Sequence, residues 1–137
     1  MLRRAAVLSI VAALVHGLNI SEHLREWWGY GLFFMFAAVV QFIYGLIMLI
    51  QPWNYDPSGA RRDGSSFARP YYLVGIALNI PLIALYLVTR TLGIPLLGPE
   101  AGEVEAFSFA GILTIVVEAA LVATLAALVR RPKVLDH

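Results

Sequence analysis

Four strongly polar side chains stand inside four long apolar runs of this sequence, one in each run: His16, Gln41, Asn79 and Glu118. Glu118 is the most unusual, because it lies near the centre of LTIVVEAALVATLAALV, residues 113–129. An ionised carboxylate facing lipid would cost at least about 2.5 kcal/mol, so we expect Glu118 to face protein or water. His16 is the only cationic candidate at the same depth, and the two could share a proton or a metal ion.

The elements that must position these residues are membrane-spanning helices. Hydrophobic residues make up 60% of the 137-residue chain and charged residues 14%, whereas soluble domains have about 45–50% and about 25%. A spanning helix needs roughly 20 apolar residues. We predict one all-α domain (residues 1–137) that forms a bundle of four transmembrane helices. The expected segments are helices at about 5–20, 31–51, 70–89 and 106–130, an interfacial segment at 21–30, a cytoplasmic loop at 52–69 and an outer loop at 90–105.

The first apolar run is short and allows two interpretations. It spans a membrane only if its helix continues into SEHL, residues 21–24. Residues 1–17 also resemble a signal peptide, with a basic start and a short apolar core, and cleavage would leave three helices. A retained helix is favoured, because His16 and Asn19 follow where a cleavage site would lie. Asn19 and Glu22 have capping-box spacing, which predicts a new helix starting at residue 20.

Basic residues predict the orientation of the bundle. They precede the first helix, follow the fourth, and lie between the second and third, whereas the other two loops are more acidic. Cytoplasmic loops carry the excess of Lys and Arg, so both termini are expected inside a bacterial cytoplasmic (inner) membrane. The net charge of +1 gives no indication of a nucleic-acid partner. The basic residues at these three places are Arg3, Arg4, Arg61, Arg62, Arg69 and the RRPK segment at 130–133.

Depth and helical spacing place the four polar residues in one layer. A rise of about 1.5 Å per residue puts all four in the middle third of a hydrocarbon core about 30 Å thick. Each shares a helix face with small or hydroxyl-bearing residues, including Tyr86 on the third helix. Such faces pack against one another, so we expect them to point into the bundle. The simpler alternative is that these side chains bond each other and only fix the packing.

A second polar cluster is expected at the outer surface. His23, Glu26, Glu103 and Glu105 offer one imidazole and three carboxylates, a set that could bind a divalent metal. The spacing matches no strict metal motif. The alternative is a solvated loop with ordinary ion pairs, such as Arg90 with Glu105.

The sequence lacks the residues and motifs that several other kinds of chemistry require. There are no cysteines, which excludes thiol catalysis and Cys-ligated zinc or iron–sulfur clusters. The sequence has no Walker loop, HExxH or GxSxG motif. The three histidines do not suit axial haem ligation within one chain, so haem is not expected. Enzymatic activity is less expected than binding.

The longest local patterns resemble a known group of proteins. EHLREWWGYGLFFMFAAVVQ and LYLVTRTLGIPLLGPEAGEVEAF, with a glutamate in the fourth helix, are similar to small bacterial four-span membrane proteins of no assigned activity. The likeness covers about residues 16–125 and rests on the TRTxGxPxxGP loop with Glu103, Glu105 and Glu118. Gly111 stands where those proteins often carry an acid. The likeness to DoxX-type proteins concerns helix number and hydropathy only.

Two functions follow as hypotheses. In the first, His16 and Glu118 handle a proton, a metal ion or a small solute, while Gln41, Asn79 and Tyr86 orient them. The outer residues would collect the ligand, and a homodimer would suit so small a chain. In the second, the protein is an accessory or scaffold subunit of a larger membrane complex, such as a respiratory one, and its polar residues serve packing alone.

Overall fold

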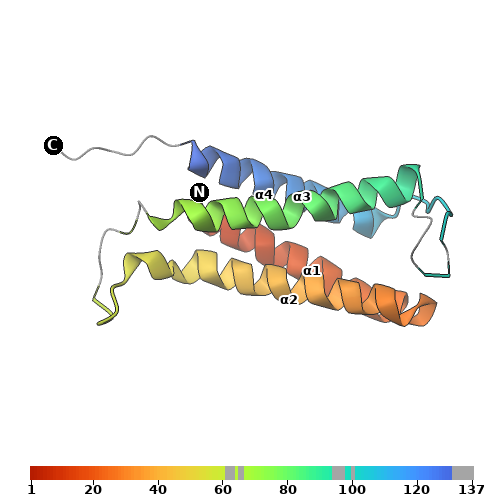
Figure 1. Ribbon diagram of the computed structural model, residues 1–137, viewed down its shortest axis with the longest axis horizontal. Helices are drawn as coiled ribbons and strands as arrows, with labels where there is room; N and C mark the ends of the chain where they lie inside the picture. The colour runs from red at the N-terminus through yellow and green to blue at the C-terminus, as the bar shows by residue number, and fades with distance from the viewer. Residues whose placement is uncertain (61–63, 65–66, 94–97, 100, 131–137) are drawn as a thin grey trace.

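A computed structural model describes residues 1–60, 64, 67–93, 98–99 and 101–130, and these residues form an all-helical bundle (Figure 1). Its elements are α1 (Leu2–Glu26), α2 (Trp28–Ile50), the short 3-10 helix η1 (Pro52–Asn54), α3 (Arg69–Thr91) and α4 (Phe109–Val129). The predicted all-α bundle of four helices is therefore confirmed. Residues 61–63 and 65–66 of the predicted cytoplasmic loop, and residues 94–97 and 100 of the predicted outer loop, lie outside the described residues.

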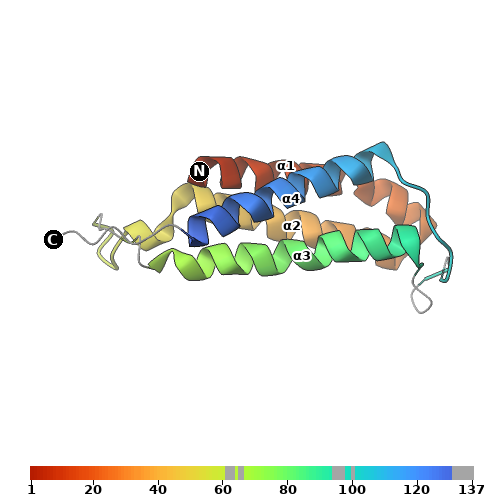
Figure 2. The same cartoon turned by 90° about the horizontal axis from the view of Figure 1, so that it is seen from above.

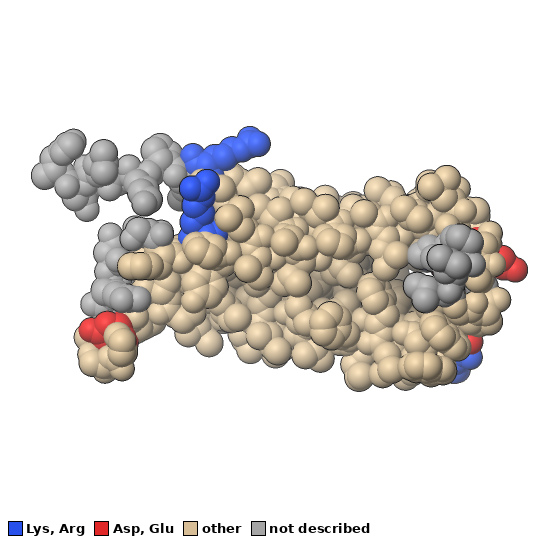
Figure 3. Space-filling view, in the orientation of Figure 1, with Lys and Arg blue, Asp and Glu red and all other residues tan. Residues whose placement is uncertain are grey.

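All four α-helices are long and apolar enough to cross a membrane. They contain 21 to 25 residues, which corresponds to about 32–38 Å of helix. Large apolar side chains cover the outer surface, among them Leu18, Phe36 and Val116 at 81%, 67% and 59% exposure. Charged side chains on the visible face gather at the two ends (Figure 3). These features describe a multi-pass membrane protein.

The first two helices form a hairpin that differs from the sequence expectation. α1 runs without interruption to Glu26, so the predicted helix start at residue 20 is wrong. The Asn19 side chain donates to the carbonyl of Val15 at 2.6 Å instead of capping a helix. Bonding to the carbonyl four residues earlier is compatible with a continuing helix. The predicted interfacial segment 21–30 is therefore mostly the last turns of α1 and the first turn of α2.

A single residue joins the two helices. Trp27 is extended, with φ −165° and ψ 137°, and helix resumes at Trp28. Gly31 makes this tight reversal possible, because a Cβ there would overlap the side chain of Leu24. The extension of α1 supplies the length that the first apolar run lacked.

Around the bundle the helices follow the order α2, α1, α4, α3, and hydrogen bonds between α2 and α3 close the ring; Figures 1 and 2 show this bundle from two directions. α1 contacts both α2 and α4, and α4 contacts α3. The N-terminus and the end of α4 lie at the same end of the bundle (Figure 1). α4 begins where Ser108 caps it, accepting a hydrogen bond from the backbone N–H of Gly111 at 3.1 Å.

The apolar core lies at the end of the bundle that carries the N-terminus and the end of α4. Met48 of α2 meets Leu121 and Leu125 of α4 there, and all three are fully buried. Alanines of α1, including Ala5 and Ala6, let the neighbouring helices approach. The opposite end is filled less completely and holds the site described next.

Candidate functional site

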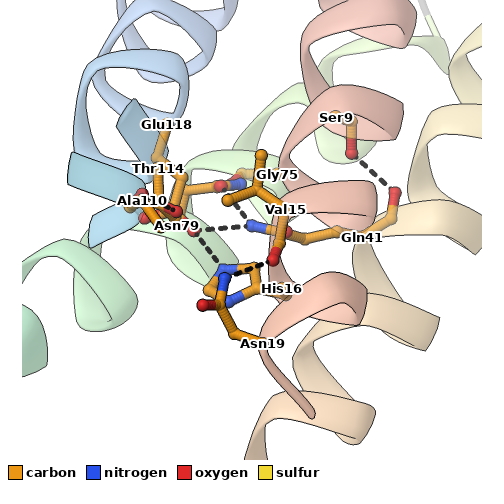
Figure 4. Close-up of polar contacts among 10 residues, drawn as sticks. All are labelled: Ser9, Val15, His16, Asn19, Gln41, Gly75, Asn79, Ala110, Thr114 and Glu118. Atoms are coloured by element: carbon orange, nitrogen blue, oxygen red, sulfur yellow. Dashed lines mark hydrogen bonds and ion pairs between the residues drawn. The ribbon is translucent and has the colours of Figure 1, made fainter. Parts of the chain in front are cut away.

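The structure brings together the four central polar residues, one from each helix (Figure 4). Glu118 Oε1 lies 2.9 Å from His16 Nε2 and accepts a hydrogen bond from Gln41 Nε2 at 2.8 Å. The same Gln41 nitrogen donates to Asn79 Oδ1 at 3.0 Å. His16 is 6% exposed and the other three are 1% exposed. One connected set of hydrogen bonds therefore crosses the bundle at mid-depth.

Neighbouring small and polar residues hold this set in place. Ser9, seven residues before His16 on α1, donates to the backbone carbonyl of Gln41 at 2.6 Å. Asn79 Nδ2 donates a hydrogen bond to the backbone carbonyl of Gly75 at 2.8 Å. A Cβ on Gly75 would overlap the Tyr44 hydroxyl group, so glycine allows α3 to approach α2.

A cavity of about 380 Å³ leads from one end of the bundle to the buried pair. Its surface rim includes Glu26 and Glu103, which are exposed, and its inner end includes His16 and Glu118, which are buried. Tyr86 also lines it, as the sequence stripe suggested. Gln41 and Asn79 do not line the cavity; Gln41 donates to Glu118, and Asn79 in turn accepts from Gln41.

The outer cluster lines the same cavity but is divided into two pairs. His23 Nδ1 lies 2.6 Å from Glu26 Oε2, and the His23 ring stacks on Phe34 with centroids 4.0 Å apart. Arg90 forms an ion pair with Glu105. This Arg90 pair is the ordinary interaction that the sequence offered as an alternative to a metal site.

The geometry gives little support to the predicted metal set of His23, Glu26, Glu103 and Glu105. Within the described ranges, no three His, Asp or Glu side chains are placed to hold a metal ion together. Glu105 is occupied by Arg90, and Glu26 by His23. The four residues share a cavity without converging on one point.

Three buried polar atoms of cavity-lining side chains have no hydrogen-bond partner among the described residues. They are His16 Nδ1, the Tyr86 hydroxyl oxygen and Arg90 Nε. A buried polar atom without a partner costs about 1–3 kcal/mol. All three are therefore points at which a bound molecule would gain hydrogen bonds.

Sequence reasoning did not reveal that the inner and outer clusters belong to one cavity. Its walls include aromatic and apolar side chains to which the sequence analysis assigned no place in a site: Trp27, Tyr30, Phe33, Phe34, Leu82 and Leu85. Leu82, Leu85 and Tyr86 follow helical spacing on α3, which is the one signal that could have placed them together.

No known protein family, curated protein or solved structure matches this chain. The resemblance to small bacterial four-span proteins therefore stays a prediction.

Proposed function

We propose that the protein binds a small solute inside the membrane, and that the His16–Glu118 pair exchanges a proton as the solute enters or leaves. The observation that carries this proposal is an ionisable pair, 2.9 Å apart, at the buried end of a cavity that reaches the surface. Intramembrane carboxylates typically mark ion, proton or substrate pathways.

The cavity has suitable dimensions and chemistry for a small molecule. Its volume of about 380 Å³ lies within the range of about 300–1,000 Å³ found for ligand pockets. Aromatic walls with a few polar groups at one end are typical of such sites. Solute binding is therefore a better use of this space than metal binding.

The hydrogen bonds at the inner end suit proton exchange. With one proton between them, His16 and Glu118 carry no net charge, whichever residue holds that proton. If the proton leaves, Glu118 becomes an anion whose Oε1 still accepts a hydrogen bond from Gln41 at 2.8 Å. Gln41 would thus stabilise the deprotonated pair while a solute occupies the cavity.

The proposal includes an orientation. Exposed arginines gather at the end where α1 and α3 begin and α4 finishes: Arg3, Arg4, Arg69 and Arg130. By the positive-inside rule we place that end in the cytoplasm of a bacterial cell and the chain in its inner membrane. The cavity would then open on the outer side.

The packing-only alternative has one observation in its favour. The chain of hydrogen bonds from His16 through Glu118 and Gln41 to Asn79 touches all four helices, which would also fix their mutual positions. An accessory subunit of a larger complex would need nothing more. It would not, however, need a cavity that leads to the pair.

A cysteine accessibility experiment separates the two functions. Because the chain has no native cysteines, only the introduced cysteine can react. Thr114 and Thr124 form a matched pair on α4: both are buried, and each donates to the carbonyl four residues earlier. Thr114 lines the cavity, whereas Thr124 does not. We expect a small neutral methanethiosulfonate to modify Thr114→Cys in lipid vesicles and to leave Thr124→Cys unmodified. Equal protection of both positions would refute the solute site.

A further inference from the structure

We infer that the solute is a small organic cation, such as a substituted ammonium; this rests on the proposed function and names its ligand class. The ionisable residues that line the cavity comprise four acids, one arginine and two histidines: Glu26, Glu103, Glu105, Glu118, Arg90, His16 and His23. Four negative charges and one positive charge give −3 with neutral histidines, and −1 with both protonated. The cavity is acidic in either state.

The single arginine does not make the cavity attractive to anions. Its guanidinium is paired with Glu105 and lies over the Tyr86 ring, 4.8 Å from the centroid. The Arg90 side chain is only 10% exposed. Its charge is thus largely balanced locally, and the carboxylates of Glu26, Glu103 and Glu118 dominate the remaining field.

The walls supply a second reason for a cation. A cation within about 6 Å of an aromatic ring centroid is attracted by the ring face, more strongly where water is excluded. Trp27, Tyr30, Phe33 and Phe34 line the cavity together with Tyr86. Arg90 on Tyr86 already shows this interaction in the same wall. Apolar substituents on the cation would pack against the same rings.

Two of the three unpartnered atoms supply a third reason, whereas the third, Arg90 Nε, is a donor on a guanidinium already paired with Glu105. In the deprotonated pair, neutral His16 carries its proton on Nε2 toward Glu118, so that Nδ1 is a hydrogen-bond acceptor without a donor. The Tyr86 hydroxyl oxygen can also accept. An ammonium N–H can donate to either atom, whereas a carboxylate ligand has no proton to offer.

Charge balance links the cation to the proposed proton. A cation that settles near Glu118 compensates one negative charge, so the His16–Glu118 pair can release its shared proton without a change in the net charge of the site. The solute and the proton would therefore compete for one carboxylate. The only covalent bond that changes is the N–H or O–H bond of the transferred proton.

The first test compares labelling of Thr114→Cys by two methanethiosulfonates of similar size, a trimethylammonium-ethyl and a sulfonatoethyl derivative. Each rate is divided by the rate at Ser21→Cys, an exposed position outside the cavity. Acidic clefts concentrate counter-ions by tenfold or more, so we expect at least about a tenfold preference for the cation. Salt should reduce it. A normalised ratio of one, or a preference for the anion, would overturn the inference.

Two acid variants assign the preference to the cavity. Glu103→Gln changes an exposed side chain and should lower the ratio without affecting folding. Glu118→Gln should lower it further. An unchanged ratio in both variants would contradict the assignment. If the neutral reagent enters but charge has no effect, solute binding stands and the cation inference fails; if the neutral reagent is excluded, the proposed function itself fails.

A second test measures binding with three probes of one shape: benzylammonium, benzyl alcohol and benzoate. Each is added at the same concentration while the neutral reagent modifies Thr114→Cys. Benzylammonium should slow the reaction most and benzoate least, and the difference should become smaller in the Glu118→Gln background. Equal protection by the three probes, or none by benzylammonium, would overturn the inference.

Discussion

At the scale of single residues, Glu118 is tolerable within the membrane because it is not isolated. Its Oε1 lies within hydrogen-bond distance of His16 Nε2 and accepts a hydrogen bond from Gln41. A proton shared with His16, as proposed, would leave the pair without net charge and avoid most of the cost of burying a carboxylate. The same arrangement keeps the carboxylate chemically available, because both members of the pair line the cavity.

Replacement of Glu118 by glutamine should separate proton chemistry from packing. Glutamine retains an oxygen that accepts from Gln41, so we expect the free energy of unfolding in mixed micelles to change by less than about 1 kcal/mol. Infrared spectroscopy should show a carboxyl band that changes with pH in the wild type and is missing in Glu118→Gln. A variant with an unchanged pH-dependent band would contradict a role for this carboxyl.

Glu118→Leu provides the comparison for stability. Leucine lacks the oxygen that accepts a hydrogen bond from Gln41, and it leaves His16 unpaired. We therefore expect the free energy of unfolding to fall by about 1–3 kcal/mol. Equal stability of the leucine and wild-type proteins would show that the hydrogen bonds contribute nothing to packing.

At the scale of elements, glycine positions decide how closely the helices approach. Gly75 of α3 packs where a Cβ would overlap the hydroxyl group of Tyr44 on α2 and approach Leu125 of α4 to 2.6 Å. This contact also sets the height of Asn79, one turn further along α3. Gly17 of α1, in contrast, has no atom within 4 Å of the corresponding Cβ position.

The two glycines give a matched test of helix packing. We expect Gly75→Ala to reduce the free energy of unfolding by about 1–3 kcal/mol through overpacking. Gly17→Ala should be neutral or stabilising by up to about 1 kcal/mol, since alanine favours helix. Denaturation in mixed micelles, followed by tryptophan fluorescence, measures both. Similar effects of the two substitutions would argue against tight contact at Gly75.

At the scale of the whole molecule, the two ends of the bundle differ. One end carries the N-terminus, the end of α4, most of the exposed arginines and the apolar core, and the other carries the cavity and its acidic rim. A bundle built this way would open its cavity to one side of the membrane only. The orientation would therefore determine which compartment supplies the proposed solute.

Cysteines at exposed positions test that orientation. Ser58 lies in the segment that joins α2 to α3, and Ala101 in the segment that joins α3 to α4 and also holds the cavity-lining Glu103. With an impermeant maleimide, we expect Ala101→Cys to react in intact spheroplasts and Ser58→Cys only after lysis. The reverse pattern would place the cavity on the cytoplasmic side.

The sequence by itself determined the features that depend on local composition. Long apolar runs with one polar residue each, such as those around Gln41 and Glu118, suffice to predict four membrane-spanning helices and a mid-depth polar layer, because lipid restricts every segment independently. The limits of the first helix were harder to predict. The spacing of Asn19 and Glu22 indicated a break, but backbone hydrogen bonds of the continuing helix prevailed.

Only the tertiary structure decided how the helices are ordered and what they enclose. Contacts such as His16 with Glu118, 102 positions apart, depend on the packing of α1 against α4. The pairing of Arg90 with Glu105, and the enclosure of both polar clusters in one cavity, depend on side-chain shape at several helices together. Hydropathy and spacing describe one helix at a time, whereas a cavity is a property of the space that all four leave between them.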